Sequence, residues 1–208
     1  MFPASNNELR ALSGAAFAAL GGLVAAGALN GLDQWACDHL MPFAGAPGSP
    51  PTFFESLVPL FHAGWHPVGA AIAQVVTLPG QIVVSFLLVL LGAWKLREPR
   101  WLVAWFGVTL VEVAIRHVLT RPALYRGGVH ITAFDSSWPS GHALRCALVA
   151  AVLATAWPRL RVPMAAWLVT SVVLLEVAGF HAPTDIAGGL LLALFAGGAL
   201  RAGGLRQP

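Results

Sequence analysis

Charged side chains are scarce in this chain of 208 residues, since Asp, Glu, Lys and Arg together make up only 10% of it. A soluble domain carries about 25% charged residues, so this shortage argues against a water-soluble globule. It also argues against an intrinsically disordered chain, because 57% of the residues are hydrophobic and the mean hydropathy is +0.73. The composition therefore predicts a protein embedded in a membrane.

Cysteine and tyrosine are also rare. The two cysteines, Cys37 and Cys146, supply no disulfide framework, and we expect free thiols because Cys146 falls inside an apolar run. Eight Trp and eleven Phe stand against one Tyr, a balance that suits a protein anchored at the edges of a bilayer. The net charge of +3 does not indicate a nucleic-acid partner, because several basic residues stand at the ends of apolar runs.

Six apolar segments predict an all-α, polytopic membrane protein, with six transmembrane helices in a bundle and a single domain over residues 1–208. A helix needs about 20 mainly apolar residues to cross a bilayer. The predicted spans are residues 11–32, 78–94, 101–120, 141–157, 162–180 and 184–200. Pro79-Gly80 divides a longer apolar run, and we take its second part as the second span. Little positive charge precedes the first span, so we expect it to be retained rather than cleaved as a signal peptide.

Basic residues fall in alternate loops, which sets the orientation. The positive-inside rule places the loops that carry them in the cytoplasm: Arg10, Lys95, Arg97, Arg100, Arg159, Arg161, Arg201 and Arg206. The opposite ends of the third to sixth spans then face outward. Residues 33–66, which include an amphipathic piece at 53–65, are predicted to lie along the outer surface.

Ionisable side chains inside apolar spans are functional candidates, because burying them in lipid is costly. Here they gather at the outward ends of the third to sixth spans: Arg116, Arg121, His142, Arg145, Glu176, His181 and Asp185. Their common level predicts an outward-facing polar pocket. Spacing suggests two ion pairs, one between Glu112 and Arg116, four residues apart on one helix face, and one between Arg145 and Glu176.

Two short patterns are specific. Trp138-Pro139-Ser140-Gly141-His142 opens the fourth span, where proline suits the first helical turn and the exposed backbone N–H groups form an anion site. His181 and Asp185 are four residues apart at the start of the sixth span. The carboxylate can therefore hold one imidazole nitrogen and leave the other free to attack.

Together these patterns resemble the type 2 phosphatidic acid phosphatase superfamily, whose members are six-helix membrane lipid phosphatases related to the soluble vanadium haloperoxidases. The family signature has three parts in this order: K-x6-R-P, P-S-G-H and S-R-x5-H-x3-D. The second part is complete at residues 139–142, and the H-x3-D of the third is complete at residues 181–185. The motif region runs from residue 116 to about residue 189, about a third of the chain.

The chain departs from the signature at the basic positions that hold phosphate in the family. The Lys of the first part falls on Arg116, which keeps the charge but presents a planar fork. The Arg-Pro falls on Ala123-Leu124, whereas this chain has Arg121-Pro122 two residues earlier. The Ser-Arg of the third part falls on Leu174-Leu175. The available substitutes are Arg121, Arg126 and Arg145.

The resemblance implies a phosphohistidine chemistry that needs no metal and no other cofactor. His181 would attack phosphorus, Asp185 would orient it, and His142 would protonate the leaving oxygen and then help to activate water. The residues implied in binding the substrate phosphate are Arg116, Arg121, Ser140, Gly141 and Arg145.

The activity implied is hydrolysis of a phosphomonoester or pyrophosphate on a membrane lipid of the polyprenyl, glycerolipid or lipid A type. The expected location is a bacterial inner membrane, with the site facing the periplasm. A lipid phosphotransferase of the same family is the nearest variant. The missing arginines leave open a non-catalytic lipid-phosphate binder or an accessory subunit of a membrane complex. A metal site built from His142, His181 and Asp185 is a third alternative. The sequence selects neither the lipid nor the oligomeric state.

Overall fold

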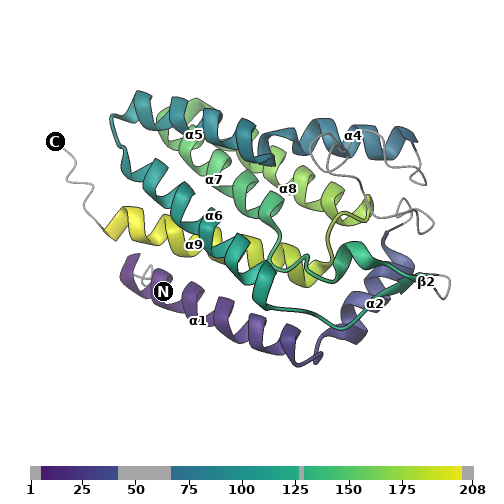
Figure 1. The fold of residues 1–208 in the computed structure, drawn as a ribbon. Coiled ribbons are helices and arrows are strands. Elements are labelled where there is room, and N and C mark those ends of the chain that lie inside the picture. Colours follow the sequence, from purple (N-terminus) through teal and green to yellow (C-terminus); the bar gives the residue numbers. More distant parts are fainter. Residues whose placement is uncertain (1–5, 42–66, 127–128, 203–208) are drawn as a thin grey trace.

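The computed structural model describes residues 6–41, 67–126 and 129–202, and helices dominate them (Figure 1). The helices are α1 (Asn6–Ala25), α2 (Asn30–His39), α4 (Pro67–Thr77), α5 (Ile82–Leu96), α6 (Arg100–Val118), α7 (Gly141–Ala156), α8 (Arg161–Val177) and α9 (Pro183–Ala202). The only strands in these ranges are β1 (Tyr125–Arg126) and β2 (Val129–His130), which pair antiparallel. The prediction of a helical fold is confirmed.

Four single stretches of helix among the described residues are long and apolar enough to cross a membrane: Asn7–Ala25, Arg100–Val118, Pro158–Val177 and Pro183–Leu200. A fifth crossing is formed if α4 and α5 count as one span, bent by 46° at a break that includes the short turn η2 (Leu78–Gly80). Helix α7 has 16 residues and is shorter than these. The structure thus supports a membrane protein with four or five candidate spans.

Two predicted spans differ from the helices observed. The first was expected to reach residue 32, but α1 ends at Ala25 and α2 begins at Asn30. Gly27 adopts a φ of 71° between them, a left-handed conformation that ends a helix. The second span was expected to begin near residue 78, but residues 67–77 are also helical. Helices α4 and α5 stand on either side of the Pro79-Gly80 turn, and they form one span, bent by 46°, if the two are counted together.

Helix α7 lies in the interior, where it packs against α5, α8 and α9. Its apolar face joins a core of side chains from four helices, α5, α6, α7 and α9: Val89, Trp105, Val108, Leu144, Leu148, Val149, Val152, Leu192, Ala193 and Ala196. The close approach of α5 to α7 depends on a small residue at the contact. A Cβ at Gly92 of α5 would lie only 2.6 Å from Val152 of α7. Because α7 is surrounded by other helices, contacts with protein rather than with lipid stabilise this short helix.

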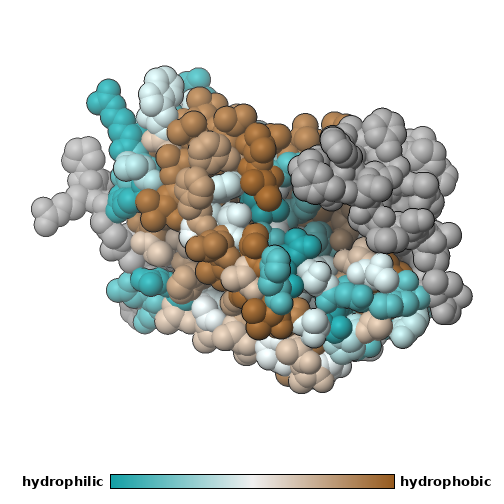
Figure 2. All heavy atoms as spheres, in the orientation of Figure 1, coloured by the Kyte–Doolittle hydropathy of each residue, from teal (hydrophilic) through white to brown (hydrophobic). Residues whose placement is uncertain are grey.

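The connections alternate between the two ends of the bundle (Figure 1). The α5–α6 and α7–α8 connections lie at the left end, together with the start of α1 and the end of α9. The α6–α7 and α8–α9 connections lie at the right end. Figure 2 shows a broad band of hydrophobic side chains across the helices between these ends. The arrangement suits a protein whose ends face water and whose middle faces lipid.

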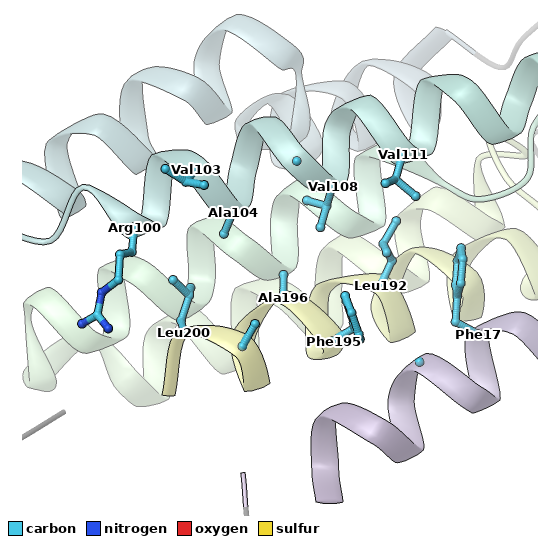
Figure 3. Close-up of a pocket in the computed structure, with 13 residues that line it drawn as sticks. Phe17, Arg100, Val103, Ala104, Val108, Val111, Leu192, Phe195, Ala196 and Leu200 are labelled. Atoms are coloured by element: carbon cyan, nitrogen blue, oxygen red, sulfur yellow. The ribbon is translucent and has the colours of Figure 1, made fainter. Parts of the chain in front are cut away.

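An apolar groove of about 630 Å³ runs between α1, α6 and α9 (Figure 3). Phe17 and Phe195 line it on one side and Val103 and Val108 on the other. Phe17 also stacks on Trp138, with ring centroids 4.9 Å apart, so α1 supports the loop that precedes α7.

Candidate active site

A small polar pocket of about 200 Å³ lies at the end of the bundle where α6 finishes and where α7 and α9 begin. Its lining consists of Gln74, Thr77, Gln81, Arg116, Ala133, Ser137, His142, Phe180 and His181. Three residues that the sequence singles out therefore meet here. Arg116 comes from the last turn of α6, His142 from the first turn of α7, and His181 from the turn before α9.

The two histidines lie beside each other in the pocket, with ring centroids 5.9 Å apart and ring planes inclined by 50°. The His181 side chain is 9% exposed, and its Nδ1 lies 3.8 Å from Oδ2 of Asp185 without a hydrogen bond. The imidazole thus turns its Nδ1 edge toward the carboxylate. Nε2 stands on the other edge of the ring, away from the carboxylate, and His181 is one of the residues that line the pocket.

Asp185 is fully buried, and three hydrogen-bond donors hold it. Its carboxylate accepts hydrogen bonds from Nη1 of Arg121 at 2.7 Å, from Oγ of Ser137 at 2.6 Å and from the backbone N–H of Ala182 at 3.0 Å. These contacts fix its position behind His181. They also place Arg121 behind the histidine, since Arg121 is not among the residues that line the pocket.

Asp33 is a buried residue of this site that the sequence analysis did not single out. Its carboxylate forms an ion pair of 2.5 Å with Nη2 of Arg121 and accepts hydrogen bonds from Oγ1 of Thr184 at 2.6 Å and its backbone N–H at 3.2 Å. One arginine therefore joins two carboxylates, Asp33 and Asp185. The available sequence signal is an acidic residue directly after the first apolar run, but its partners are 88 and 151 residues away.

A third buried carboxylate, Glu112, joins the other two arginines. Its Oε1 accepts a hydrogen bond from Nη1 of Arg116 at 3.1 Å, and its Oε2 accepts one from Nη1 of Arg145 at 3.0 Å. The predicted Glu112–Arg116 pair is confirmed. The predicted pair between Arg145 and Glu176 is wrong, because Arg145 points to the α4–α5 break, where its Nε donates to the carbonyl of Gly80 at 2.7 Å.

The Ser140–Gly141 pair forms the start of α7. Oγ of Ser140 accepts a hydrogen bond from the backbone N–H of Ala143 at 3.1 Å and so caps the helix. The backbone N–H of Ser140 donates to the carbonyl of Asp185 at 2.8 Å, which joins the starts of α7 and α9. Gly141 has no room for a side chain, since a Cβ there would lie 2.5 Å from Glu112 and 2.6 Å from Arg145.

Two charge clusters thus flank the histidines. The Asp33–Arg121–Asp185 cluster has one arginine between two carboxylates and a formal charge of −1. The Arg116–Glu112–Arg145 cluster has one carboxylate between two arginines and a formal charge of +1. The negative cluster lies behind His181, and the positive cluster reaches the pocket through Arg116. Such an arrangement favours an anion in the pocket.

Some sequence predictions lie outside the described residues. They include the amphipathic segment 53–65, most of the predicted surface segment 33–66, and the side chain of Arg126. Within the described residues, no group of three or more His, Cys, Asp or Glu side chains is placed to hold a metal ion, which is the arrangement that the metal-site alternative requires.

No known protein family, curated protein or solved structure matches the chain.

Proposed function

We propose that this protein is a membrane-embedded lipid phosphatase that hydrolyses a phosphomonoester or pyrophosphate through a phosphohistidine. One observation carries the proposal: His142, His181 and Arg116 line one polar pocket, and Asp185 stands behind His181. This set contains a nucleophile with its orienting carboxylate, a second titratable group beside it and a cation for phosphate. The motif resemblance to type 2 phosphatidic acid phosphatases assigns the same roles to His142, His181 and Asp185.

In the first chemical step, Nε2 of His181 attacks phosphorus while the bond from phosphorus to the lipid oxygen breaks. The leaving oxygen takes the bonding electron pair, and His142 gives it a proton. Asp185 stabilises the positive imidazole ring of the phosphohistidine. In the second step, water attacks phosphorus, His142 accepts a proton from that water, and the P–N bond breaks to release inorganic phosphate and His181.

The phosphate oxygens carry the charge that the site must stabilise in both steps. Arg116 supplies a guanidinium at the pocket wall, and α7 begins at Gly141 with its N-terminal end near His142. The free N–H groups and the dipole of a helix N-terminus favour an anion.

The apolar helices support a lipid-linked substrate and a membrane location. The pocket lies at the end of the bundle away from the α5–α6 and α7–α8 connections, and the basic residues in or beside those connections are Lys95, Arg97, Arg159 and Arg161. We propose that these loops face the cytoplasm of a bacterium, that six helical segments cross the inner membrane, and that the pocket faces the periplasm.

A non-catalytic lipid-phosphate binder is the second candidate, and one observation favours it. Arg121 and Arg145 do not line the pocket, and Arg116 is the one arginine among the described residues that does. Such a site can bind phosphate and yet stabilise a transition state poorly. A phosphotransferase would use the same phosphohistidine, with an alcohol in place of water.

The test is phosphate release by the detergent-purified protein from a panel of polyprenyl, glycerolipid and lipid A phosphates, with EDTA present. Wild type is compared with His181→Ala and with the control His117→Ala, since His117 is an exposed residue of α6 outside the pocket. We expect release by wild type and by the control and none by His181→Ala. Release by folded His181→Ala would overturn the phosphohistidine mechanism, and phosphate binding without release by wild type would favour the binder.

A further inference from the structure

Glu112 is shared between an arginine that lines the pocket and one that does not. Arg116 belongs to the pocket wall, with a side chain 38% exposed, whereas the Arg145 side chain is 5% exposed and lies behind the wall. We propose that the buried Glu112–Arg145 pair positions Arg116 for phosphate. This inference rests on the proposed function, and it adds Glu112 and Arg145 as positioning residues for the phosphate-binding group.

The contacts of Arg116 fix the direction of its guanidinium. Nη1 donates to Oε1 of Glu112 at 3.1 Å, and Nε donates to the carbonyl of Ser136 at 2.7 Å. A guanidinium has five N–H donors in one plane, so two contacts on different nitrogens set the plane. The remaining donors, including both on Nη2, are available to a phosphate in the pocket. Without Glu112, only the Ser136 contact would hold this side chain.

Arg145 sets the charge of the cluster. Glu112 and Arg116 alone would form a neutral pair, which attracts an anion weakly. The second ion pair of Glu112, with Nη1 of Arg145 at 3.0 Å, gives the cluster its formal charge of +1. Arg145 also offsets the free-energy cost of burying the Glu112 carboxylate, because a buried carboxylate needs a partner of opposite charge. The pair thus keeps Arg116 oriented without cancelling its attraction for phosphate.

The same arginine connects the cluster to another wall of the pocket. Nε of Arg145 donates to the carbonyl of Gly80, in the break between α4 and α5. Thr77 and Gln81, which flank this break, line the pocket. Gly80 lies against α7, since a Cβ there would stand 2.7 Å from Sγ of Cys146 and 3.0 Å from the carbonyl oxygen of His142. Arg145 therefore ties the break to the first turns of α7.

The experiment distinguishes two roles for the Glu112–Arg145 pair: positioning Arg116, and only holding α6 against α7. Its variants are Glu112→Leu/Arg145→Met, Arg116→Gln and the triple variant that combines them. Replacing a buried ion pair by apolar side chains of similar volume often preserves stability, and here it also preserves a formal charge of +1 on Arg116. The readouts are the Kd for orthovanadate, which mimics the phosphoryl transition state, the KM and kcat for the best lipid phosphate, and the Tm in detergent.

We expect the double variant to keep its Tm and to lose about 10- to 100-fold in orthovanadate affinity, by analogy with the loss when a residue that orients a metal ligand is removed. The triple variant should bind no more weakly than Arg116→Gln, because the pair acts through Arg116. Wild-type affinity in the folded double variant would overturn the inference. So would an additive loss in the triple variant, since the pair would then act independently of Arg116.

Two further variants keep the inference testable if the apolar pair does not fold. Glu112→Gln/Arg145→Gln retains the formal charge and an acceptor oxygen for Arg116, so we expect about wild-type orthovanadate affinity. Arg145→Gln alone leaves a neutral cluster and should lose about tenfold, with KM raised more than kcat is lowered. Equal affinity in Arg145→Gln and wild type would overturn the inference. A wild type that neither binds orthovanadate nor releases phosphate would instead overturn the proposed function itself.

Discussion

Nη1 of Arg121 donates a 2.7 Å hydrogen bond to Asp185, the carboxylate that faces His181. The same guanidinium forms a 2.5 Å ion pair with Asp33 of α2. Arg121 and Asp185 thus form part of the support of the histidine rather than of the pocket wall. Helix α2, which contains none of the recognised motifs, contributes to the site through this contact.

Arg121→Met should destabilise the protein strongly. The substitution leaves Asp33 and Asp185 buried and close together without their shared cation, which costs about 3–5 kcal/mol for a buried pair. The measurement is the Tm and the monodisperse fraction in detergent. The matched control is Arg159→Gln at an exposed position in the α7–α8 connection, where we expect a change of about 0.5 kcal/mol or less. Equal stability of the two variants would contradict this account of the cluster.

Asp185→Asn should abolish most of the turnover. The amide cannot stabilise a positive ring at His181, so we expect kcat to fall by about 10²- to 10⁴-fold. Initial rates on the lipid phosphate that wild type prefers provide the test. Asp135→Asn is the control, since Asp135 pairs with His130 in the α6–α7 connection and does not line the pocket. Turnover near the wild-type value in Asp185→Asn would exclude its role beside His181.

Gly189→Ala should disrupt the junction between α7 and α9. A Cβ at this position would overlap the carbonyl oxygen of Ser140 and lie 3.1 Å from the backbone nitrogen of Leu144. Backbone on both sides leaves no flexible group to move aside, so we expect a loss of about 1–3 kcal/mol or failure to fold. Gly197→Ala in the same helix has nothing within 4 Å and should be tolerated. The measurement is the Tm of the two purified variants in detergent, and equal Tm values would contradict the prediction.

The proposed orientation predicts opposite labelling of two engineered thiols. Thr132→Cys lies in the α6–α7 connection and Lys95→Cys lies near the end of α5, and both parent residues are exposed. In intact bacterial spheroplasts, a membrane-impermeant maleimide should label Thr132→Cys and should reach Lys95→Cys only after lysis. Both native cysteines are buried, which keeps the background low. The reverse pattern would place the pocket on the cytoplasmic side.

Local sequence was a good guide to α6, α7, α8 and α9, whose bounds lie within a few residues of the predicted spans. The reason is that hydrophobic runs and their ends are properties of neighbouring residues. The same information was insufficient at Gly27, which separates α1 from α2, and at the Pro79-Gly80 turn, which separates α4 from α5. A turn signal marks a break in either case, but it does not say whether the helices on its two sides belong to one span.

The sequence by itself determined that the chain has helices apolar enough to cross a membrane and that its charges gather at one level of those helices. The spacing within α6 also determined the Glu112–Arg116 pair, because residues four apart share a helix face. Only the tertiary structure decided that Arg145 pairs with Glu112 rather than with Glu176, and that Asp33 completes the site. Those contacts depend on how helices far apart in the chain rotate and pack, which no local pattern encodes.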